Sequence, residues 1–297
     1  MKLPEVETPS YYKPGAILTL QLAPDDITCL VEVIKPFIPF TISQVLLCKP
    51  AESQTEPSHP LIDQLPEAFI VKVYDPRYMD HRLPFKSRPA RPWSLDGEQE
   101  AATRREERGC PGRDANYDLA NWPEEDDDKP GWEEWYFQSA EDQYYHESEA
   151  YKRLEPVQGV TIPRCYGYGT LKLPQRAISP HILVIEYISD AETLEKIDPA
   201  CVPPELAQSL LNGIKEVNQL GVVHTDLNPG NILLTPRDRP TRAVVIDFGH
   251  AGLREEEDDE TWREVLEEND DPYWMRARLK RSLGEDILGS SGAAPAA

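Results

Sequence analysis

The sequence has no long hydrophobic run and no cysteine motif. No stretch approaches the roughly 18 apolar residues of a membrane span, and the N-terminal segment MKLPEVETPSYYKPG lacks the apolar core of a signal peptide. The five cysteines form neither a CxxC motif nor a Cys/His cluster, and their number is odd. These absences argue against a membrane protein, a zinc site and a disulfide scaffold. They predict an intracellular protein, cytoplasmic or nuclear, with reduced thiols.

Positive charge is also scarce. The chain has 31 Lys and Arg residues against 53 Asp and Glu residues, a formal net charge of -22. Such a surface repels phosphate groups, so neither nucleic acid nor an anionic membrane is an expected partner. A nucleotide bound through a metal ion is not excluded, because the cation reverses the local field. A basic protein partner would suit the same surface, although no segment points to a particular one.

Hydrophobic periodicity divides the chain into strands and helices in an α+β order. The predicted strands are 27–37, 40–49, 68–75, 159–171, 181–188, GNILLT and RAVVIDF, and the predicted helices are 132–154, 203–221, WREVLEEN and YWMRARLKRSLG. Residues 1–26 are expected to be irregular and residues 289–297 to be a flexible tail. The order predicts two lobes, 27–188 and a smaller, mostly helical one over 189–288, joined near residues 186–192.

A long segment, residues 76–131, interrupts this pattern between a strand and a helix. It contains a basic stretch, HRLPFKSRPARPW, and an acidic run, EEDDD, at 124–128. We interpret it as a solvated insertion or a disordered segment. A partner-binding arm is the alternative.

Two polar stretches stand between apolar runs: LGVVHTDLNPGNILL at 220–234 and AVVIDFG at 243–249. The chain between Asn231 and Asp247 is long enough for a hairpin, which would bring the two stretches side by side. Transfer of a γ-phosphoryl group needs a carboxylate that positions the attacking hydroxyl and accepts its proton, and hard oxygen ligands for Mg²⁺. Asp226 can supply the first, and Asn231 and Asp247 can supply the second.

The pattern HxDxxxxN followed by DFG resembles the catalytic and metal-binding loops of the protein-kinase-like superfamily. The resemblance covers residues 27–75 and 132–252 and is closest to compact, divergent, fungal-type members. It implies a bilobal protein-kinase-like fold, with an N-terminal antiparallel sheet plus one helix and a shortened, mostly helical C-terminal lobe. ATP and Mg²⁺ are the implied cofactors.

The same resemblance gives roles to residues outside the two loops. Lys72 in FIVKVYD would hold the α- and β-phosphates, unless it is a lysine on the solvent face of an edge strand. Its helix partner would be Glu147, which precedes Leu154 by the family's seven-residue spacing, with Glu149 as the second candidate. His224 would hydrogen-bond backbone near the DFG turn and is expected to be structural.

The strand LVIEYISDAETL resembles the hinge that binds adenine through backbone groups. Those groups would belong to Glu186 and Ile188, with Ile185 at the back of the pocket. Glu192 stands where kinases often hold the ribose, and a solvated charge before a helix explains it equally well.

Four departures separate this chain from ordinary protein kinases. No GxGxxG lies between the first two predicted strands, where KPFIPFTI stands. Asn228 replaces a lysine that neutralises the transferred phosphate in Ser/Thr kinases. Only 48 residues, 250–297, follow the DFG and they contain no APE motif. The insertion at about 76–131 is the fourth departure.

The sequence thus predicts an ATP- and Mg²⁺-dependent phosphotransferase whose acceptor hydroxyl belongs to a protein Ser or Thr or to a small alcohol. The alternative is a pseudokinase, a nucleotide-binding or scaffold module with little catalysis. The missing glycine-rich loop and short C-terminal region favour that alternative, whereas the intact catalytic and metal-binding residues favour the enzyme.

Overall fold

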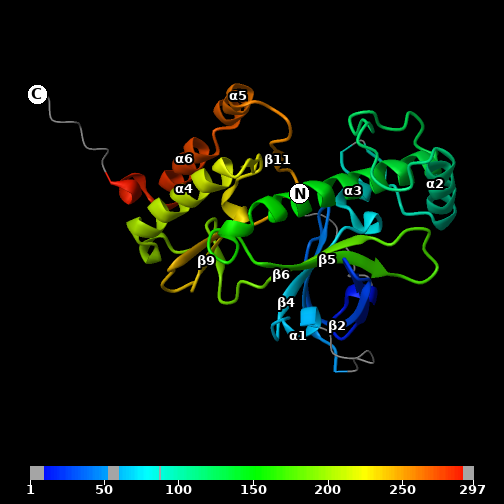
Figure 1. The fold of residues 1–297 in the computed structure, drawn as a ribbon, viewed down its shortest axis with the longest axis horizontal. Coiled ribbons are helices and arrows are strands. Elements are labelled where there is room, and N and C mark those ends of the chain that lie inside the picture. Colours follow the sequence, from blue (N-terminus) through cyan, green and yellow to red (C-terminus); the bar gives the residue numbers. More distant parts are fainter. Residues whose placement is uncertain (1–9, 53–59, 87, 290–297) are drawn as a thin grey trace, which may run out of the picture. The chain divides into compact units, whose positions relative to one another are not determined.

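The computed structural model describes residues 10–52, 60–86 and 88–289, and it is shown in Figure 1. The chain forms two compact units, one made of residues 1–145 and 165–187 and the other of residues 146–164 and 188–297. The strands of each sheet pair in antiparallel fashion and helices lie between strands along the chain, so the fold is α+β, as the sequence predicts. Within the described ranges, no helix is both long enough and apolar enough to cross a membrane.

The first unit contains a closed antiparallel barrel whose strands follow the order β1-β2-β3-β4-β6-β5. The strand bounds are β1 Ile17–Leu22, β2 Ile27–Phe37, β3 Gln44–Pro50, β4 Phe69–Val73, β5 Cys165–Lys172 and β6 His181–Glu186. Alternating apolar side chains of these strands fill the barrel, among them Leu20, Val31 and Val71, which are all fully buried. A bulge in β2 between Val33 and Lys35 bends that strand where it pairs with β3.

The expectation that residues 1–26 are irregular was wrong for Ile17–Leu22, which form β1. The alternation in ILTLQL directs Leu18, Leu20 and Leu22 into the barrel. β1 pairs with β2 and also with β5, whose residues lie far along the chain. The alternation and the neighbouring strand β2 are local signals, but the short strand stands within a Pro-rich segment that favours irregular structure. The flexible tail predicted at 289–297 lies outside the described residues except for Gly289.

The first two strands are consequently β1 and β2, and not the pair that the sequence predicts. Their connection is a tight turn of four residues, Ala23–Asp26, without glycine. The segment KPFIPFTI instead connects β2 to β3. Neither connection contains a glycine-rich loop. The chain therefore lacks a GxGxxG between its first two strands, as the sequence predicts, although those strands are not the predicted pair.

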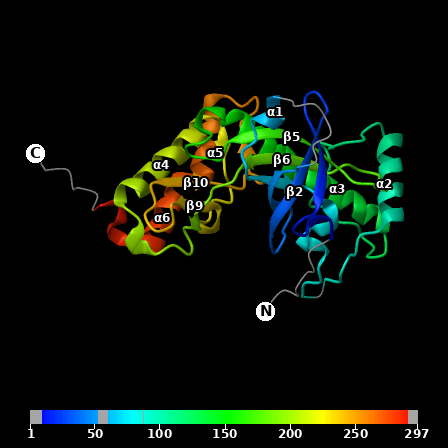
Figure 2. The same ribbon diagram turned by 90° about the horizontal axis from the view of Figure 1, so that it is seen from below.

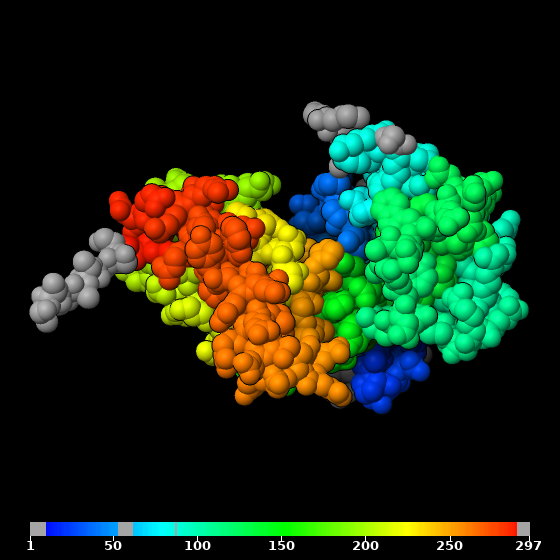
Figure 3. All heavy atoms as spheres, turned by 90° about the horizontal axis from the view of Figure 1, so that it is seen from above, coloured from blue at the N-terminus to red at the C-terminus, as the bar shows by residue number. Residues whose placement is uncertain are grey.

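The described residues of the insertion, 76–86 and 88–131, form defined turns and a helix with buried side chains, contrary to the interpretation as a solvated or disordered segment. The insertion contains two 3-10 turns, Pro76–Tyr78 and Asp80–Arg82, and helix α2, Leu95–Glu107. Ser94 caps α2 by accepting a hydrogen bond from the Gly97 N–H at 3.2 Å. Figures 1 and 2 both show α2 beside the first part of α3, Lys129–Arg153. In Figure 3 the coloured atoms of the insertion, cyan to green, form a continuous part of the visible surface.

The second unit begins within α3, between Tyr145 and His146. Its other elements are α4 Pro204–Gln219, α5 Asp259–Asn269, α6 Asp271–Leu283, β7 Glu192–Thr193, β8 Val222–Val223, β9 Ile232–Thr235, β10 Arg242–Val245 and β11 Gly252–Leu253. The amphipathic helix α4 buries Leu210, Leu211 and Ile214. Residues 146–164 were expected in the N-terminal lobe, but the structure groups them with the second unit. Side-chain packing of Tyr151 on Phe248 is one reason.

Candidate active site

The polar loop that begins at His224 is held by its own side chains. The Asp226 N–H donates to the His224 carbonyl at 2.7 Å, which turns the chain sharply. The amide Nδ2 of Asn231 then donates to the Asp226 carbonyl at 2.9 Å and to its Oδ2 at 3.2 Å. Asp226 is exposed, and its carboxylate therefore has both a fixed orientation and access to a substrate.

Asn228 supports the same carboxylate from the other side. Its Nδ2 lies 3.2 Å from Asp226 Oδ1, and its Oδ1 accepts a hydrogen bond from the Gly230 N–H at 2.9 Å. The second contact caps the short 3-10 turn Pro229–Asn231. A lysine at this position could not accept the capping hydrogen bond, so Asn228 belongs to the local architecture of the loop.

The hairpin predicted between Asn231 and Asp247 is confirmed. β9 and β10 pair in antiparallel register, with Ile232 opposite Val245. One residue further out, the Ile246 N–H donates to the Asn231 carbonyl at 3.0 Å. The hairpin thus brings the DFG segment to the start of β9. Asp247 is exposed and has a φ of 71°, a left-handed conformation that is uncommon for a residue other than glycine.

His224 and Phe248 form the buried base under these loops. His224 is 1% exposed, its Nε2 lies 2.9 Å from the Ile246 carbonyl, and its ring centroid lies 4.8 Å from that of Phe248. Phe248 is fully buried and also packs edge-on against Tyr151 of α3. The histidine therefore contacts backbone beside the DFG segment, which agrees with its predicted structural role.

The two candidate glutamates of α3 differ in burial. Glu147 is 1% exposed, whereas the Glu149 side chain is 27% exposed and pairs with Lys152 at 2.5 Å. A surface pair at i,i+3 contributes little stability and needs no functional explanation. A fully buried carboxylate requires a compensating partner, so burial favours Glu147, as the sequence predicts.

Lys72 lies in the middle of β4 in the first unit. β4 pairs with β3 on one side and β6 on the other, so it is not an edge strand and the alternative interpretation of Lys72 was wrong. The residue is 6% exposed and its Nζ lies 5.9 Å from the centroid of the Tyr74 ring. Burial of a lysine in an otherwise apolar strand is costly, which favours a functional reason for it.

The predicted hinge residues fall at the end of β6 and just beyond it. Glu186 is the last residue of β6 and pairs with Phe69, and Ile188 is 8% exposed in the second unit. Glu192 lies in β7, and its Oε1 accepts a hydrogen bond from the Thr193 N–H at 3.0 Å. Their roles in binding adenine and ribose stay predictions.

The donor set of the two loops suits Mg²⁺. Within the described residues, no group of three or more His, Cys, Asp and Glu side chains could hold a metal ion by itself. Mg²⁺ retains several waters and uses one or two carboxylates with substrate phosphates, so it does not need such a group. The Asp247 carboxylate and the Asn231 amide oxygen are ligands of this kind, because the Asn231 nitrogen is already engaged by Asp226.

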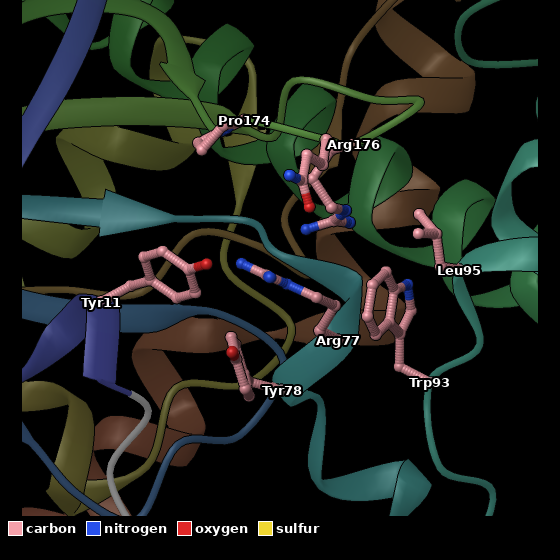
Figure 4. A pocket seen from close by; sticks show the side chains of 8 residues that line it. Tyr11, Arg77, Tyr78, Trp93, Leu95, Pro174 and Arg176 are labelled. Atoms are coloured by element: carbon pink, nitrogen blue, oxygen red, sulfur yellow. The ribbon is translucent and has the colours of Figure 1, made fainter.

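Sequence reasoning missed a second constellation, in the first unit. A pocket of about 570 Å³ is lined by Tyr11, Arg77, Tyr78, Trp93, Leu95, Pro174, Gln175 and Arg176 (Figure 4). Under it, Asp75 accepts hydrogen bonds from Arg77 Nη2 at 2.6 Å, Arg176 Nη1 at 3.3 Å and the Tyr12 hydroxyl at 2.9 Å. Burial would raise the pKa of Asp75, but Arg176 and Arg77 outweigh burial and hold that pKa below its usual value.

A signal for this constellation was present in the aromatic content. Disordered segments are poor in aromatic residues, yet Trp93 and Trp122 lie inside the insertion. The Trp93 Nε1 donates to Glu98 Oε2 at 2.8 Å, and Trp122 packs edge-on against Trp132 and Trp135 of α3. The basic and acidic runs of the insertion are typical of a solvated segment, so the sequence pattern did not predict these contacts.

Comparison with known proteins supports the pattern of the loops. Residues 141–269 match the family described as the ABC1 atypical kinase-like domain. A stretch of 77 residues is 31% identical to serine/threonine-protein kinase pkn2 of Myxococcus xanthus and amounts to 25% of this chain and 9% of that protein. The family match includes Glu147 and both polar loops but not Lys72.

Solved structures show more distant similarities. The kinase PK-1 of Cydia pomonella granulovirus matches 75% of this chain and 55% of its own, with a TM-score of 0.39 and 11% identity. The Rio2 kinase of Chaetomium thermophilum, in an ADP/Mg²⁺-phosphoaspartate complex, matches 88% of this chain and 57% of its own, with a TM-score of 0.44 and 13% identity. The matched regions thus span little more than half of each solved kinase.

Proposed function

Because the chain belongs to the protein-kinase-like superfamily, we propose that it is an ATP- and Mg²⁺-dependent phosphotransferase with a bilobal kinase-like fold. The acceptor is a hydroxyl group, on a protein Ser or Thr or on a small alcohol. The observation that carries the proposal is the orientation of the exposed Asp226 carboxylate by Asn231 and Asn228.

The proposed mechanism assigns one task to each residue. Asp226 orients the acceptor hydroxyl and takes up its proton as the γ-phosphoryl group is transferred. Asn231 and Asp247 hold Mg²⁺, which would neutralise charge on the phosphates when bound. Lys72, partnered by Glu147, holds the α- and β-phosphates. Catalysis then comes from positioning and electrostatic stabilisation rather than from covalent chemistry.

The hinge completes the nucleotide site in this proposal. Backbone groups of Glu186 and Ile188 bind adenine, and Glu192 binds the ribose. Recognition by backbone explains why a half-buried Glu and a buried Ile suit these positions equally well. The turn at Ala23–Asp26 lacks glycine, so the phosphates depend more strongly on Lys72 and Mg²⁺ than they do in kinases with a glycine-rich loop.

The test is turnover of ATP against a panel of protein and small-alcohol acceptors, with Asp226→Ala and Asp247→Ala as variants. Both variants should lose transfer to the background rate while they remain folded. Arg239→Ala, in the turn between β9 and β10, provides a control that should retain the wild-type rate. Transfer by either Asp variant at the wild-type rate would overturn the mechanism.

A pseudokinase is the second candidate, and the glycine-free turn between β1 and β2 favours it. A thermal shift with ATP and Mg²⁺ separates the two candidates, because a ligand at 100 times its Kd stabilises the folded state by about 2.7 kcal/mol. A shift without turnover supports a nucleotide-binding pseudokinase. No shift at millimolar nucleotide supports a scaffold, for which the acidic surface would bind a basic protein.

A further inference from the structure

The insertion is joined to the first half of α3 by buried ion pairs. Arg82 and Glu133 form a bidentate pair, with Nη1–Oε1 at 3.0 Å and Nη2–Oε2 at 2.6 Å, and the two side chains are 5% and 4% exposed. The Arg82 guanidinium also lies 3.8 Å from the centroid of the Tyr136 ring. Glu133 accepts a further hydrogen bond from the Ser94 N–H at 3.0 Å, which ties the start of α2 to α3.

The last turn of α2 makes a second junction. Arg105 Nη1 lies 2.7 Å from Glu134 Oε2, and Arg108 Nη2 lies 2.9 Å from Glu134 Oε1. The Arg105 side chain is 2% exposed and its guanidinium lies 3.6 Å from the centroid of the Phe137 ring. Gly97 allows α2 to approach α3 closely, because a Cβ there would lie 3.2 Å from atoms of Lys129 and Glu133.

A third junction lies closer to Glu147. Arg113 donates to Asp142 Oδ1 from Nε at 3.0 Å and from Nη2 at 2.8 Å. The next residue, Asp114, donates its N–H to Gln138 Oε1 at 2.9 Å. As a result residues 132–138 of α3 are buried all around the helix, as in the middle of a protein core.

The other side of the insertion is attached to the end of β4. Glu98 of α2 pairs with Arg176, with Nε–Oε1 at 2.8 Å, and Arg176 in turn reaches Asp75 at 3.3 Å. Figure 4 shows Arg77 and Arg176 pointing into the same region beside Trp93. Asp75 lies two residues after the end of β4 at Val73 and three residues after Lys72. One segment thereby binds both the strand that carries Lys72 and the helix that carries Glu147.

We propose that the insertion is an internal clamp that fixes α3 against the end of β4, and that it sets the position of Glu147 without a partner protein or a covalent modification. This inference rests on the proposed function, in which Lys72 and Glu147 hold the phosphates. Kinases need that pair in place for transfer, and they commonly control it through the helix. Here Arg82, Arg105 and Arg113 are the positioning residues.

The physical basis is the cost of separating buried charges. Removal of one member of a buried pair leaves the other without compensation in a low dielectric, which is far less favourable than the loss of an exposed pair. A continuous helix transmits its position along its axis, so ion pairs at positions 133, 134 and 142 also restrain the same helix at position 147, five residues beyond the last of them. The clamp therefore acts on Glu147 without touching it.

The test compares Arg113→Ala and Arg105→Gln with Arg104→Ala. The Arg104 pair, with Glu100 at 2.5 Å, lies wholly within α2 and its side chains are 49% and 54% exposed, so it is a matched control. Amide exchange of residues 146–150 should accelerate about tenfold in the first two variants without nucleotide, and kcat/KM for ATP should fall by about tenfold. Arg104→Ala should change neither, and Arg105→Lys should recover part of the loss.

Two outcomes decide the proposal. If exchange at 146–150 and kcat/KM in the two variants match those of Arg104→Ala, while residues 76–128 alone exchange faster, the insertion is not a clamp. If Arg105→Gln fails to fold, Arg113→Ala decides the matter, because its pair is only partly buried at 26% and 30% exposure. The exchange measurement needs no turnover. An inactive wild type would therefore refute the proposed function, whereas the clamp would still be tested by amide exchange of residues 146–150.

Discussion

The Ile246 N–H donates to the carbonyl of Asn231 at 3.0 Å, and the side chain of the same Asn231 donates to Asp226. One residue thus joins the strand that leads into Asp247 to the proposed proton acceptor. Its main chain fixes one loop and its side chain orients the other. A substitution of Asn231 keeps the main-chain hydrogen bond to Ile246 and removes only the side-chain hydrogen bond to Asp226, so the side-chain role can be tested by mutation.

Substitution of Asn231 should therefore reduce transfer without unfolding the hairpin. Asn231→Ala removes a donor to Asp226 and a proposed Mg²⁺ ligand, and we expect kcat to fall by about 10²–10³-fold. Asn231→Asp keeps an oxygen ligand but places a second carboxylate beside Asp226. ATP turnover as a function of Mg²⁺ concentration measures both effects. An unchanged Mg²⁺ dependence in Asn231→Ala would contradict the assignment of this ligand.

Asn228 offers a way to separate the capping role from the catalytic one. Asn228→Asp retains an oxygen that accepts the Gly230 N–H but replaces the donor to Asp226 with a second carboxylate oxygen, so the cap should persist while kcat falls by about tenfold. Asn228→Ala loses both and should destabilise the protein by an additional ~1 kcal/mol. Urea unfolding and initial rates test the pair. Equal rates in wild type and Asn228→Asp would show that the Asp226 contact is not used.

Removal of the His224 ring should destabilise the second unit. His224→Ala leaves the Ile246 carbonyl without its partner and opens a cavity beside Phe248, and we expect a loss of ~3 kcal/mol in the free energy of unfolding. Urea denaturation measures this loss. His81→Ala is the control, because that ring is 42% exposed. A loss no larger than that of the control would show that the histidine does not support the loops.

The pair of His181 with Glu141, at 3.3 Å, should make stability depend on pH. Burial alone lowers the pKa of His181, but the hydrogen bond and charge of Glu141 outweigh burial and raise that pKa above 6.5. A raised folded-state pKa stabilises the protein fully below the unfolded-state value of about 6.5, and the contribution is lost as pH rises through the folded-state value.

The corresponding measurement is urea unfolding of wild type, His181→Gln and Glu141→Gln between about pH 5.5 and 8.5. The stability difference between wild type and each variant should be largest at the acidic end and shrink toward the alkaline end. A difference that grows with pH would mean that the histidine folds in its neutral form. Glu141→Gln retains a side chain of the same size and is the cleaner comparison, because His181→Gln also removes the ring that stacks on Tyr144 with 4.1 Å between centroids.

Several features could be predicted from the sequence because their signals are local. The strands at 27–37 and 68–75 and the helix that begins near residue 132 follow from periodicity, and the hairpin between Asn231 and Asp247 follows from two apolar runs with a turn between them. The preference for Glu147 over Glu149 came from the family's spacing. The structure buries Glu147 and leaves the Glu149 side chain 27% exposed, and the pairing of Glu147 with Lys72 stays a prediction.

Other features depend on residues that meet only after folding. The barrel closes because β1 pairs with the distant strand β5, and Lys72 is buried because β4 has a neighbour on both sides. The insertion seemed solvated because Arg82, Arg105 and Arg113 look like surface charges until Glu133, Glu134 and Asp142 are found opposite them. A charge is exposed or buried according to its partner, and sequence does not identify that partner.

The sequence by itself thus determined the chemistry of the two polar loops, since the order and spacing of His224, Asp226, Asn231 and Asp247 are properties of one short stretch of chain. Only the tertiary structure decided what surrounds that chemistry. It closed the barrel through β1 and packed the insertion against α3. The physical reason is that backbone turns and periodicity act over a few residues, whereas ion pairs and barrel closure join residues that the chain keeps far apart.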